Sequence, residues 1–107
     1  MVLSDLNQEI YLIITTEGDK ETASKLANLL LNEKLIPCVT FKNIESYFWW
    51  EGNIKKSKEV QLIIKCKKEN INKVCNKISE YHSYEVPEII YFLVSANKSY
   101  YDWVYSF

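Results

Sequence analysis

The segment Ser46–Asn53, SYFWWEGN, places four aromatic residues in a row directly before a Gly-Asn pair. Successive side chains of a β-strand point to opposite faces of the sheet, so two of these rings would lie on each face. The pair Gly52-Asn53 favours positive φ angles and predicts a tight hairpin turn. The segment 59–66, EVQLIIKC, alternates apolar and other residues. It therefore predicts the returning strand of the hairpin.

Three further segments have strand patterns, at 9–16 (EIYLIITT), 35–41 (LIPCVTF) and 85–94 (EVPEIIYFLV). The first is apolar on both faces and rich in β-branched residues, which is typical of a central strand. Pro37 and Pro87 lie near the starts of the other two, where proline is tolerated. We expect a break near Lys42-Asn43, between the segment 35–41 and the aromatic segment.

Two amphipathic helices are predicted between these strands. Asp19 is a suitable N-cap for the first, and Glu21 favours the positive end of its dipole. Apolar residues recur at helical spacing on one face of each helix: Ala23, Leu26, Ala27 and Leu30 on the first, and Ile71, Val74, Cys75 and Ile78 on the second. Ser99 and Asp102, three positions apart, resemble a capping box and predict a short C-terminal helix.

The order strand–helix–strand–strand–helix–strand predicts an α+β fold, the ferredoxin-like βαββαβ sandwich with a long hairpin between its second and third strands. The length of 107 residues predicts a single domain over 1–107. Helices would cover one face of the antiparallel sheet, and with it one pair of the four rings. The other face would be bare in a monomer. We expect a second copy of the chain to cover it, or else the long hairpin of the same subunit.

Composition argues against several functional classes. The net charge is -1, and all 13 basic residues are lysines. A nucleic-acid-binding domain is expected to be basic, and the RNP1 motif of RNA-binding proteins that share this element order is absent. Without arginine, the chain lacks the forked grip on phosphate that acylphosphatase-like hydrolysis needs. Two glycines cannot build a phosphate-binding loop, so we expect no enzyme.

Cysteine usage and hydropathy predict a cytoplasmic protein with free thiols. Cys38, Cys66 and Cys75 are odd in number and have no CxxC spacing. The N-terminal segment shows no basic region followed by an apolar stretch, so no signal peptide is predicted. No apolar run approaches the roughly 20 residues that span a bilayer, so no membrane association is expected.

Five motifs, in this order and spacing, resemble the CutA divalent-cation tolerance proteins: PCVTF, SYFWWEG, EVQLIIK, HSYEVPEII and SYYDWV. The resemblance extends from about Ile10 to Val104. It implies a tight homotrimer with strand exchange through the long hairpin, similar in architecture to the PII signalling proteins. It also implies binding of copper or a similar divalent cation. The alternative is a PII-like signalling or scaffold trimer that binds a small ligand or a protein partner at its inter-subunit clefts.

The resemblance assigns family positions to Cys38, Trp50, Glu51, Gly52, Glu59, Lys65, His82, Tyr84, Pro87, Glu88, Tyr100 and Trp103. The chain departs from the family pattern in its hairpin, which is often acidic but here carries Lys55, Lys56 and Lys58. Their role is left open. His82 is followed by Ser83, where the family usually has proline.

His82 and Cys38 are the candidate metal ligands. Imidazole is the commonest metal ligand in proteins, and thiolate favours Cu(I). Each residue also has a structural explanation. His82 lies at a helix C-terminus, where it suits the last carbonyls, and a buried free cysteine usually acts as a small hydrophobe. One histidine and three scattered cysteines do not give the spacing of a structural zinc site.

A second set of candidates belongs to an inter-subunit cleft or interface: Trp49, Trp50, Glu51, Glu59, Lys65, Tyr84, Glu88 and Trp103. They would line a small-molecule pocket, or form a structural network that sets the trimer geometry. Of the remaining thiols, Cys75 lies on an apolar helix stripe and is expected in the core. Cys66 has lysine neighbours that would lower its pKa if it were exposed.

Overall fold

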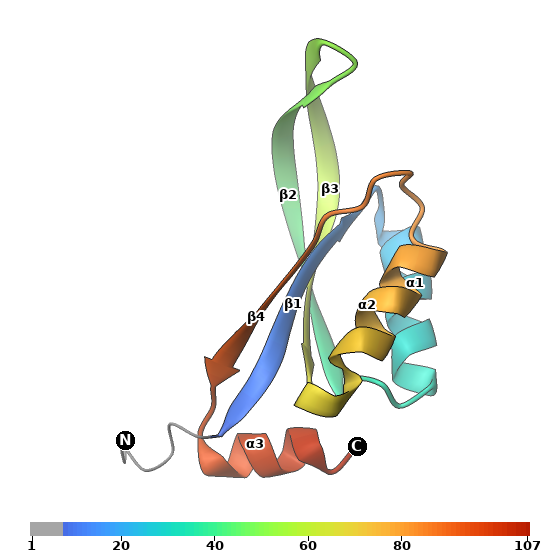
Figure 1. Ribbon diagram of the computed structural model, residues 1–107. Helices are drawn as coiled ribbons and strands as arrows, with labels where there is room; N and C mark the ends of the chain where they lie inside the picture. The colour runs from blue at the N-terminus through green and yellow to red at the C-terminus, as the bar shows by residue number, and fades with distance from the viewer. Residues whose placement is uncertain (1–7) are drawn as a thin grey trace.

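The computed structural model describes residues 8–107. The first seven residues of the predicted domain, and with them the predicted absence of a signal peptide, lie outside the described residues. Four antiparallel strands form one sheet in the order β2-β3-β1-β4 (Figure 1). The strands are β1 (Glu9–Glu17), β2 (Cys38–Trp50), β3 (Asn53–Cys66) and β4 (Ile89–Ser95). The helices are α1 (Lys20–Asn32), α2 (Ile71–Tyr81) and α3 (Lys98–Tyr105), with a 3-10 turn η2 (Lys68–Asn70) before α2. The α+β ferredoxin-like order is confirmed.

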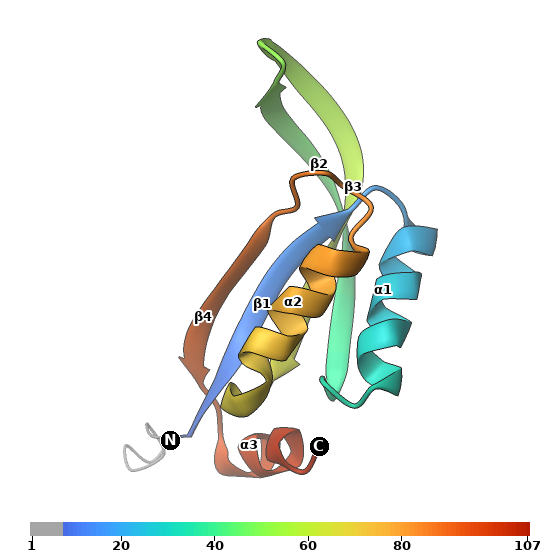
Figure 2. The ribbon, with the colours of Figure 1, turned by 45° about the vertical axis from the view of Figure 1, so that its right-hand side comes forward.

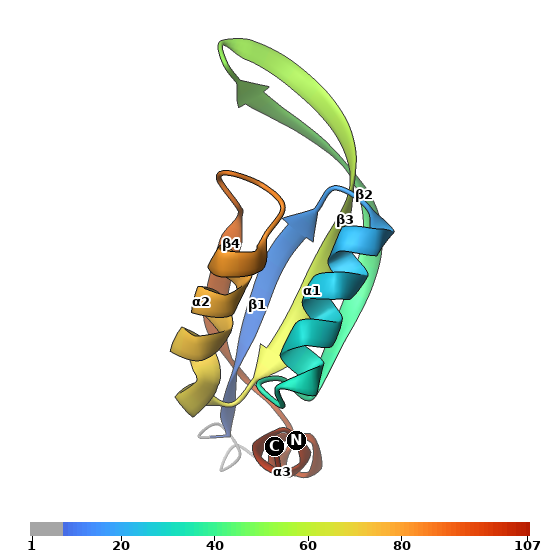
Figure 3. The same ribbon diagram turned by 90° about the vertical axis from the view of Figure 1, so that its right-hand side faces the viewer.

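Helices α1 and α2 lie side by side over one face of the sheet (Figure 3). Ile13, Leu62 and Ile64 of the sheet are fully buried beneath them, together with Leu30 and Ile78 of the helices. Each such side chain contributes about 1.5–3 kcal/mol by leaving water. Helix α1 begins as predicted, because the Asp19 carboxylate accepts a hydrogen bond of 2.8 Å from the Thr22 backbone N–H. No helix in the described part of the chain has both the length and the apolar character to cross a membrane.

Three local predictions are wrong. Strand β2 runs without a break through Lys42-Asn43, since each of its residues from Cys38 to Trp50 pairs with β3. The hairpin turn has its positive φ angles at Glu51 (51°) and Gly52 (79°), because Trp50 pairs directly with Asn53 and leaves these two in the centre. Helix α3 has no capping box: its N-cap side chain makes no capping bond, and Asp102 lies 2.9 Å from the Lys98 ammonium instead.

The β2–β3 hairpin projects beyond the rest of the sheet and beyond both helices (Figure 1). Strand β1 stops pairing with β3 at Val60, while β2 continues to pair as far as the turn. Tyr47 and Trp49 share the face of β2 that continues the helix-covered side, yet they are 67% and 71% exposed. The expectation that helices cover one pair of rings is therefore wrong. The ribbon leaves the helical layer before it reaches the rings.

The opposite face of the sheet is open over most of its area. Helix α3 packs across one end of it, where Ile10 and Val104 are buried (Figure 2). The Tyr105 hydroxyl fixes this helix by donating to the Glu9 carbonyl (3.1 Å). Toward the other end Ile90 and Phe92 of β4 remain 49% and 44% exposed. The outer edge of β4 pairs with no strand among residues 8–107.

Candidate functional site

A groove of about 870 Å³ lies between the hairpin and the loop that joins α2 to β4. Most of its hairpin side is formed by alternate residues that share one face of the ribbon, among them Ile44, Phe48 and Trp50 of β2. Glu59 of β3 belongs to the same face, because it pairs with Ile44. The other wall is the loop segment 83–88. The groove thus exists because the ribbon extends past the sheet and the loop rises beside it.

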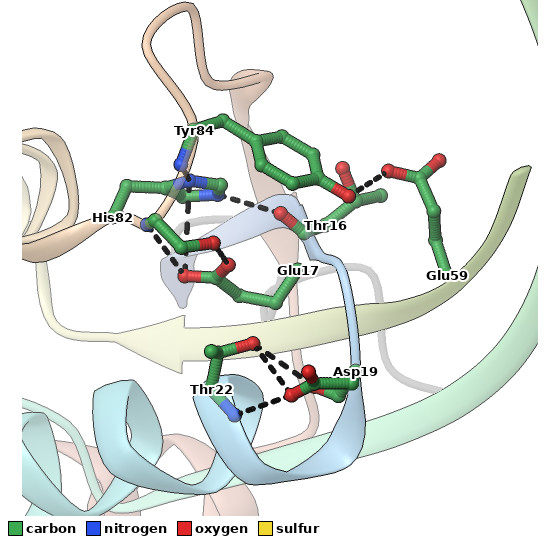
Figure 4. A network of polar contacts seen from close by, with 8 residues as sticks. Thr16, Glu17, Asp19, Thr22, Glu59, His82 and Tyr84 are labelled. Atoms are coloured by element: carbon green, nitrogen blue, oxygen red, sulfur yellow. Dashed lines mark hydrogen bonds and ion pairs between the residues drawn. The ribbon is translucent and has the colours of Figure 1, made fainter.

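The loop is held by His82, which follows the last turn of α2 and has a fully buried side chain. Its Nε2 lies 2.6 Å from the Thr16 carbonyl, and its Nδ1 lies 3.0 Å from the Tyr84 backbone N–H (Figure 4). A carbonyl only accepts and a backbone N–H only donates. The ring is therefore neutral, with its proton on Nε2. Both nitrogens are occupied within the chain, so a metal ion at either would displace a hydrogen bond.

Glu17, the last residue of β1, holds the same loop from below. Its side chain is 1% exposed and accepts hydrogen bonds from the Ser83 backbone N–H (3.2 Å) and the Ser83 hydroxyl. Its Oε2 lies 3.7 Å from His82 Nδ1. A buried carboxylate needs such donors to offset its lost hydration. Sequence reasoning missed Glu17 and Ser83, although a charged residue ending the apolar run EIYLIITTE was a usable signal.

Tyr84 connects the loop to the hairpin. Its hydroxyl donates a hydrogen bond of 2.6 Å to Glu59 Oε2, and Figure 4 shows its ring reaching from the His82 side toward Glu59. The Glu59 residue is 8% exposed. Burial and the Glu59 carboxylate raise the pKa of the Tyr84 phenol, so the hydroxyl remains a neutral donor.

Cys38 lies at the other end of the sheet. Through Lys65 of β3, Cys38 is level with Leu12 of β1, whereas the His82 ring is bound to Thr16 of β1. Four strand residues separate these positions, or roughly 13 Å. The structure therefore does not bring the two candidate metal ligands together. Within residues 8–107 no three His, Cys, Asp or Glu side chains converge as a metal site would require. The metal role of His82 and Cys38 stays a prediction.

Cys38 has a partner of its own at the open face. Its Sγ lies 3.3 Å from the hydroxyl of Tyr100 in α3. Burial, followed by this contact, raises the pKa of Tyr100 to about 12. The Tyr100 ring lies 5.7 Å from that of Trp103, which is 42% exposed. Lys65 and Trp103 therefore belong to the α3 end of the sheet.

The other predicted cleft residues divide between two places. Trp50, Glu59, Tyr84 and Glu88 all line the groove, while Trp49 and Glu51 lie exposed at the hairpin tip. In a single copy, the residues predicted to line one cleft therefore lie at separate places along the molecule.

The two remaining thiols are not activated. Cys66 is fully buried on the helix-facing side of β3, and burial raises its pKa to about 12. Cys75 is partly buried, and burial also raises its pKa. The neighbouring lysines were expected to lower the pKa of Cys66 only if its thiol were exposed, and the thiol is buried.

The sheet topology, the projecting hairpin and the groove at its base define a ferredoxin-like protein with an extended β2–β3 hairpin. The family model of the CutA1 divalent ion tolerance protein matches residues 11–106. The divalent-cation tolerance protein CutA of Pyrococcus horikoshii is 36% identical over 94 residues, which cover 87% of this chain and 92% of the relative. The chain belongs to the CutA divalent-cation tolerance family.

Solved structures and more distant relatives agree with this assignment. The structure titled as the periplasmic divalent cation tolerance protein CutA from Archaeoglobus fulgidus matches with a TM-score of 0.87 at 33% identity, covering 91% of this chain and 96% of that one. Protein CutA 1, chloroplastic, of Oryza sativa is 33% identical and covers 86% of this chain and 53% of the relative. The names place these two relatives in different compartments.

Proposed function

We propose that the protein is a homotrimer that binds copper or a similar divalent cation and acts by binding, without catalysis. The carrying observation is membership of a family whose relatives are named divalent-cation tolerance proteins. Because residues 8–107 of one copy hold no cluster of three metal-binding side chains, the proposed metal site combines residues from more than one copy.

The open face of the sheet supports assembly. Ile90 and Phe92 are about half exposed, so covering what remains would contribute roughly 0.7–1.5 kcal/mol each, half the value for a full burial. The unpaired outer edge of β4 favours strand pairing with another chain. The hairpin also needs support, since an isolated two-stranded ribbon is marginally stable in water. All three features are satisfied at once by neighbouring copies around an axis.

Cys38 is the first metal ligand to test. Its thiol is partly exposed on the face that assembly would cover, so a neighbouring copy would come close to it. His82 is less favourable, because its imidazole would have to release Thr16 or Tyr84 before binding a metal.

The experiment is calorimetric titration of the assembled, reduced protein with Zn(II), and with Cu(II), under anaerobic conditions after the reductant is removed. We expect stoichiometric binding that is lost in Cys38→Ser and retained in the matched control Cys75→Ser. Weak binding by the unmodified protein would contradict the metal proposal. A monomer mass by light scattering at micromolar concentration would contradict the trimer.

The proposal includes a cytoplasmic location without a nucleic-acid or membrane partner. The net charge of -1 and the absence of arginine support the second part, because both disfavour contact with nucleic acid and with anionic membranes. Cell fractionation and a low-salt RNA-binding assay test these two points. Recovery in a membrane or periplasmic fraction would contradict the location.

A second candidate function is a PII-like trimer that binds a small ligand or a partner protein. The observation in its favour is the groove of about 870 Å³ with a buried carboxylate in its wall. A thermal-shift screen of small ligands tests it, with a rise in unfolding temperature as the expected result.

A further inference from the structure

We propose that the groove at the base of the hairpin binds an organic cation through a primary ammonium group, with the Glu59 carboxylate as its anchor. The inference rests on the second candidate function, a small-ligand site in this groove, and it names the chemistry of the ligand. Its test is separate from the metal titration, so either proposal can fail alone.

Among residues 8–107 of one copy, the buried carboxylate of Glu59 has no cation beside it. The residue is 8% exposed, and among residues 8–107 its carboxylate accepts one hydrogen bond, from the neutral Tyr84 hydroxyl. It belongs to none of the ion pairs of the described chain. A buried charge is costly unless an opposite charge and further hydrogen bonds compensate it. A positively charged ligand in the groove would supply both.

The lysines of β3 do not supply this charge within one copy. Lys55 lines the same groove but pairs with Phe48, four positions from Glu59 along the strand, or roughly 13 Å. Lys58 is adjacent in sequence and therefore points to the opposite face of the ribbon. Lys65 lies six positions away in the other direction, roughly 20 Å.

The rest of the groove is suited to an organic cation. The Trp50 and Phe48 rings line its hairpin side, and aromatic faces attract ammonium groups. Glu85 and Glu88 lie in its loop wall. With Glu59 they place three carboxylates against the single ammonium of Lys55, so the lining is acidic although the whole chain is nearly neutral. Such a cleft raises the local concentration of cations.

A metal ion fits this groove less well than an ammonium group. Divalent ions require several oxygen, nitrogen or sulfur ligands that converge at about 2.0–2.6 Å. No three such acidic, histidine or cysteine residues converge in the described chain. An ammonium group needs one carboxylate and a few neutral acceptors, and Ser57 and Gln61 flank Glu59 on the same face of β3. The observations therefore favour the organic cation.

The test uses n-butylamine and 1,5-diaminopentane, both charged at pH 7, with 1-butanol as the uncharged control compound. Binding to the assembled protein is measured by calorimetry and by the shift in unfolding temperature. Glu59→Gln keeps the shape and can still accept from Tyr84, but it carries no charge. Glu69→Gln, an exposed residue of η2 outside the groove, is the matched charge control.

We expect both amines to bind the unmodified protein and Glu69→Gln, and Glu59→Gln to bind at least tenfold more weakly. Butanol should cause no shift. Absence of amine binding in the unmodified protein, or equal binding by Glu59→Gln, would overturn the proposal. A third result would also overturn it: the unmodified protein binds no amine, and Glu59→Gln fails to assemble. That result would assign the missing cation to a lysine of another copy. Displacement of bound amine by Zn(II) at one equivalent would assign the groove to a metal.

Discussion

Replacing Tyr84 by phenylalanine isolates one hydrogen bond of the candidate site. The substitution keeps the ring and removes the hydroxyl that donates to Glu59 Oε2 at 2.6 Å. Glu59 is 8% exposed, so water has little access to replace the lost donor. A hydrogen bond to a charged group contributes about 1.5–3 kcal/mol. We expect the free energy of unfolding to fall by that amount.

For a domain of this size a change of 1 kcal/mol moves the unfolding temperature by about 4–8 °C. The predicted decrease for Tyr84→Phe is therefore roughly 6–24 °C. Urea titration at one fixed protein concentration gives the free energy directly, because the stability of an oligomer depends on concentration. The slope of the transition should remain unchanged.

The matched control is Tyr101→Phe, because the Tyr101 hydroxyl makes no hydrogen bond within residues 8–107. Its effect should stay within about 0.5 kcal/mol. A loss of less than 0.5 kcal/mol in Tyr84→Phe would refute the reasoning. It would mean that water reaches Glu59 in the folded protein and replaces the lost donor.

The same pair predicts a dependence on alkaline pH. The pKa of Tyr84 is raised above its ordinary value of 10.0 by burial and then by Glu59. A group with a raised folded pKa contributes stability that is complete below its unfolded pKa and is lost at higher pH. Stability should thus decline as pH rises above 10, and this decline should be smaller in Tyr84→Phe. Identical alkaline profiles would contradict the assignment.

Three further predictions concern the core, the turn and assembly. Cys66→Ser should cost about 1–3 kcal/mol in urea unfolding, because it places a hydroxyl in the apolar core; a neutral effect would mean that the hydroxyl finds a partner. Glu51→Asn should raise the unfolding free energy by about 0.5–1 kcal/mol, because φ at this position is positive; a loss would argue against the two-residue turn. If the proposed trimer forms, Trp50→Ala should lower the average mass measured by light scattering at low concentration, whereas the more exposed Trp49→Ala should affect it less.

Local patterns predicted most of the secondary structure. The apolar stripes on α1 and α2 and the Asp19 N-cap are short-range features, and the structure confirms them. The turn was placed one residue late. Gly52 was recognised, but strand register, which pairs Trp50 with Asn53, decides which two residues occupy its centre.

The candidate site was predicted in part. Glu59, Tyr84, Trp50 and Glu88 were named together and do line one groove. The prediction places Lys65 in the same cleft, but Lys65 lies near α3. It is six positions from Glu59 along strand β3 and pairs with Cys38. Glu17 was missed because its role depends on a loop that lies 66 positions later in the chain.

The order of the elements and the family follow from the sequence alone, because periodicity, caps and motif spacing are properties of neighbouring residues. The contacts of His82 depend on the tertiary structure. Its two ring nitrogens form hydrogen bonds with Thr16 and Tyr84, and the ring lies far from Cys38. The burial of Glu59 with no cation beside it among residues 8–107 also depends on the tertiary structure. Hydrogen-bond partners and burial arise when distant segments meet, and no local pattern specifies which atoms then face each other.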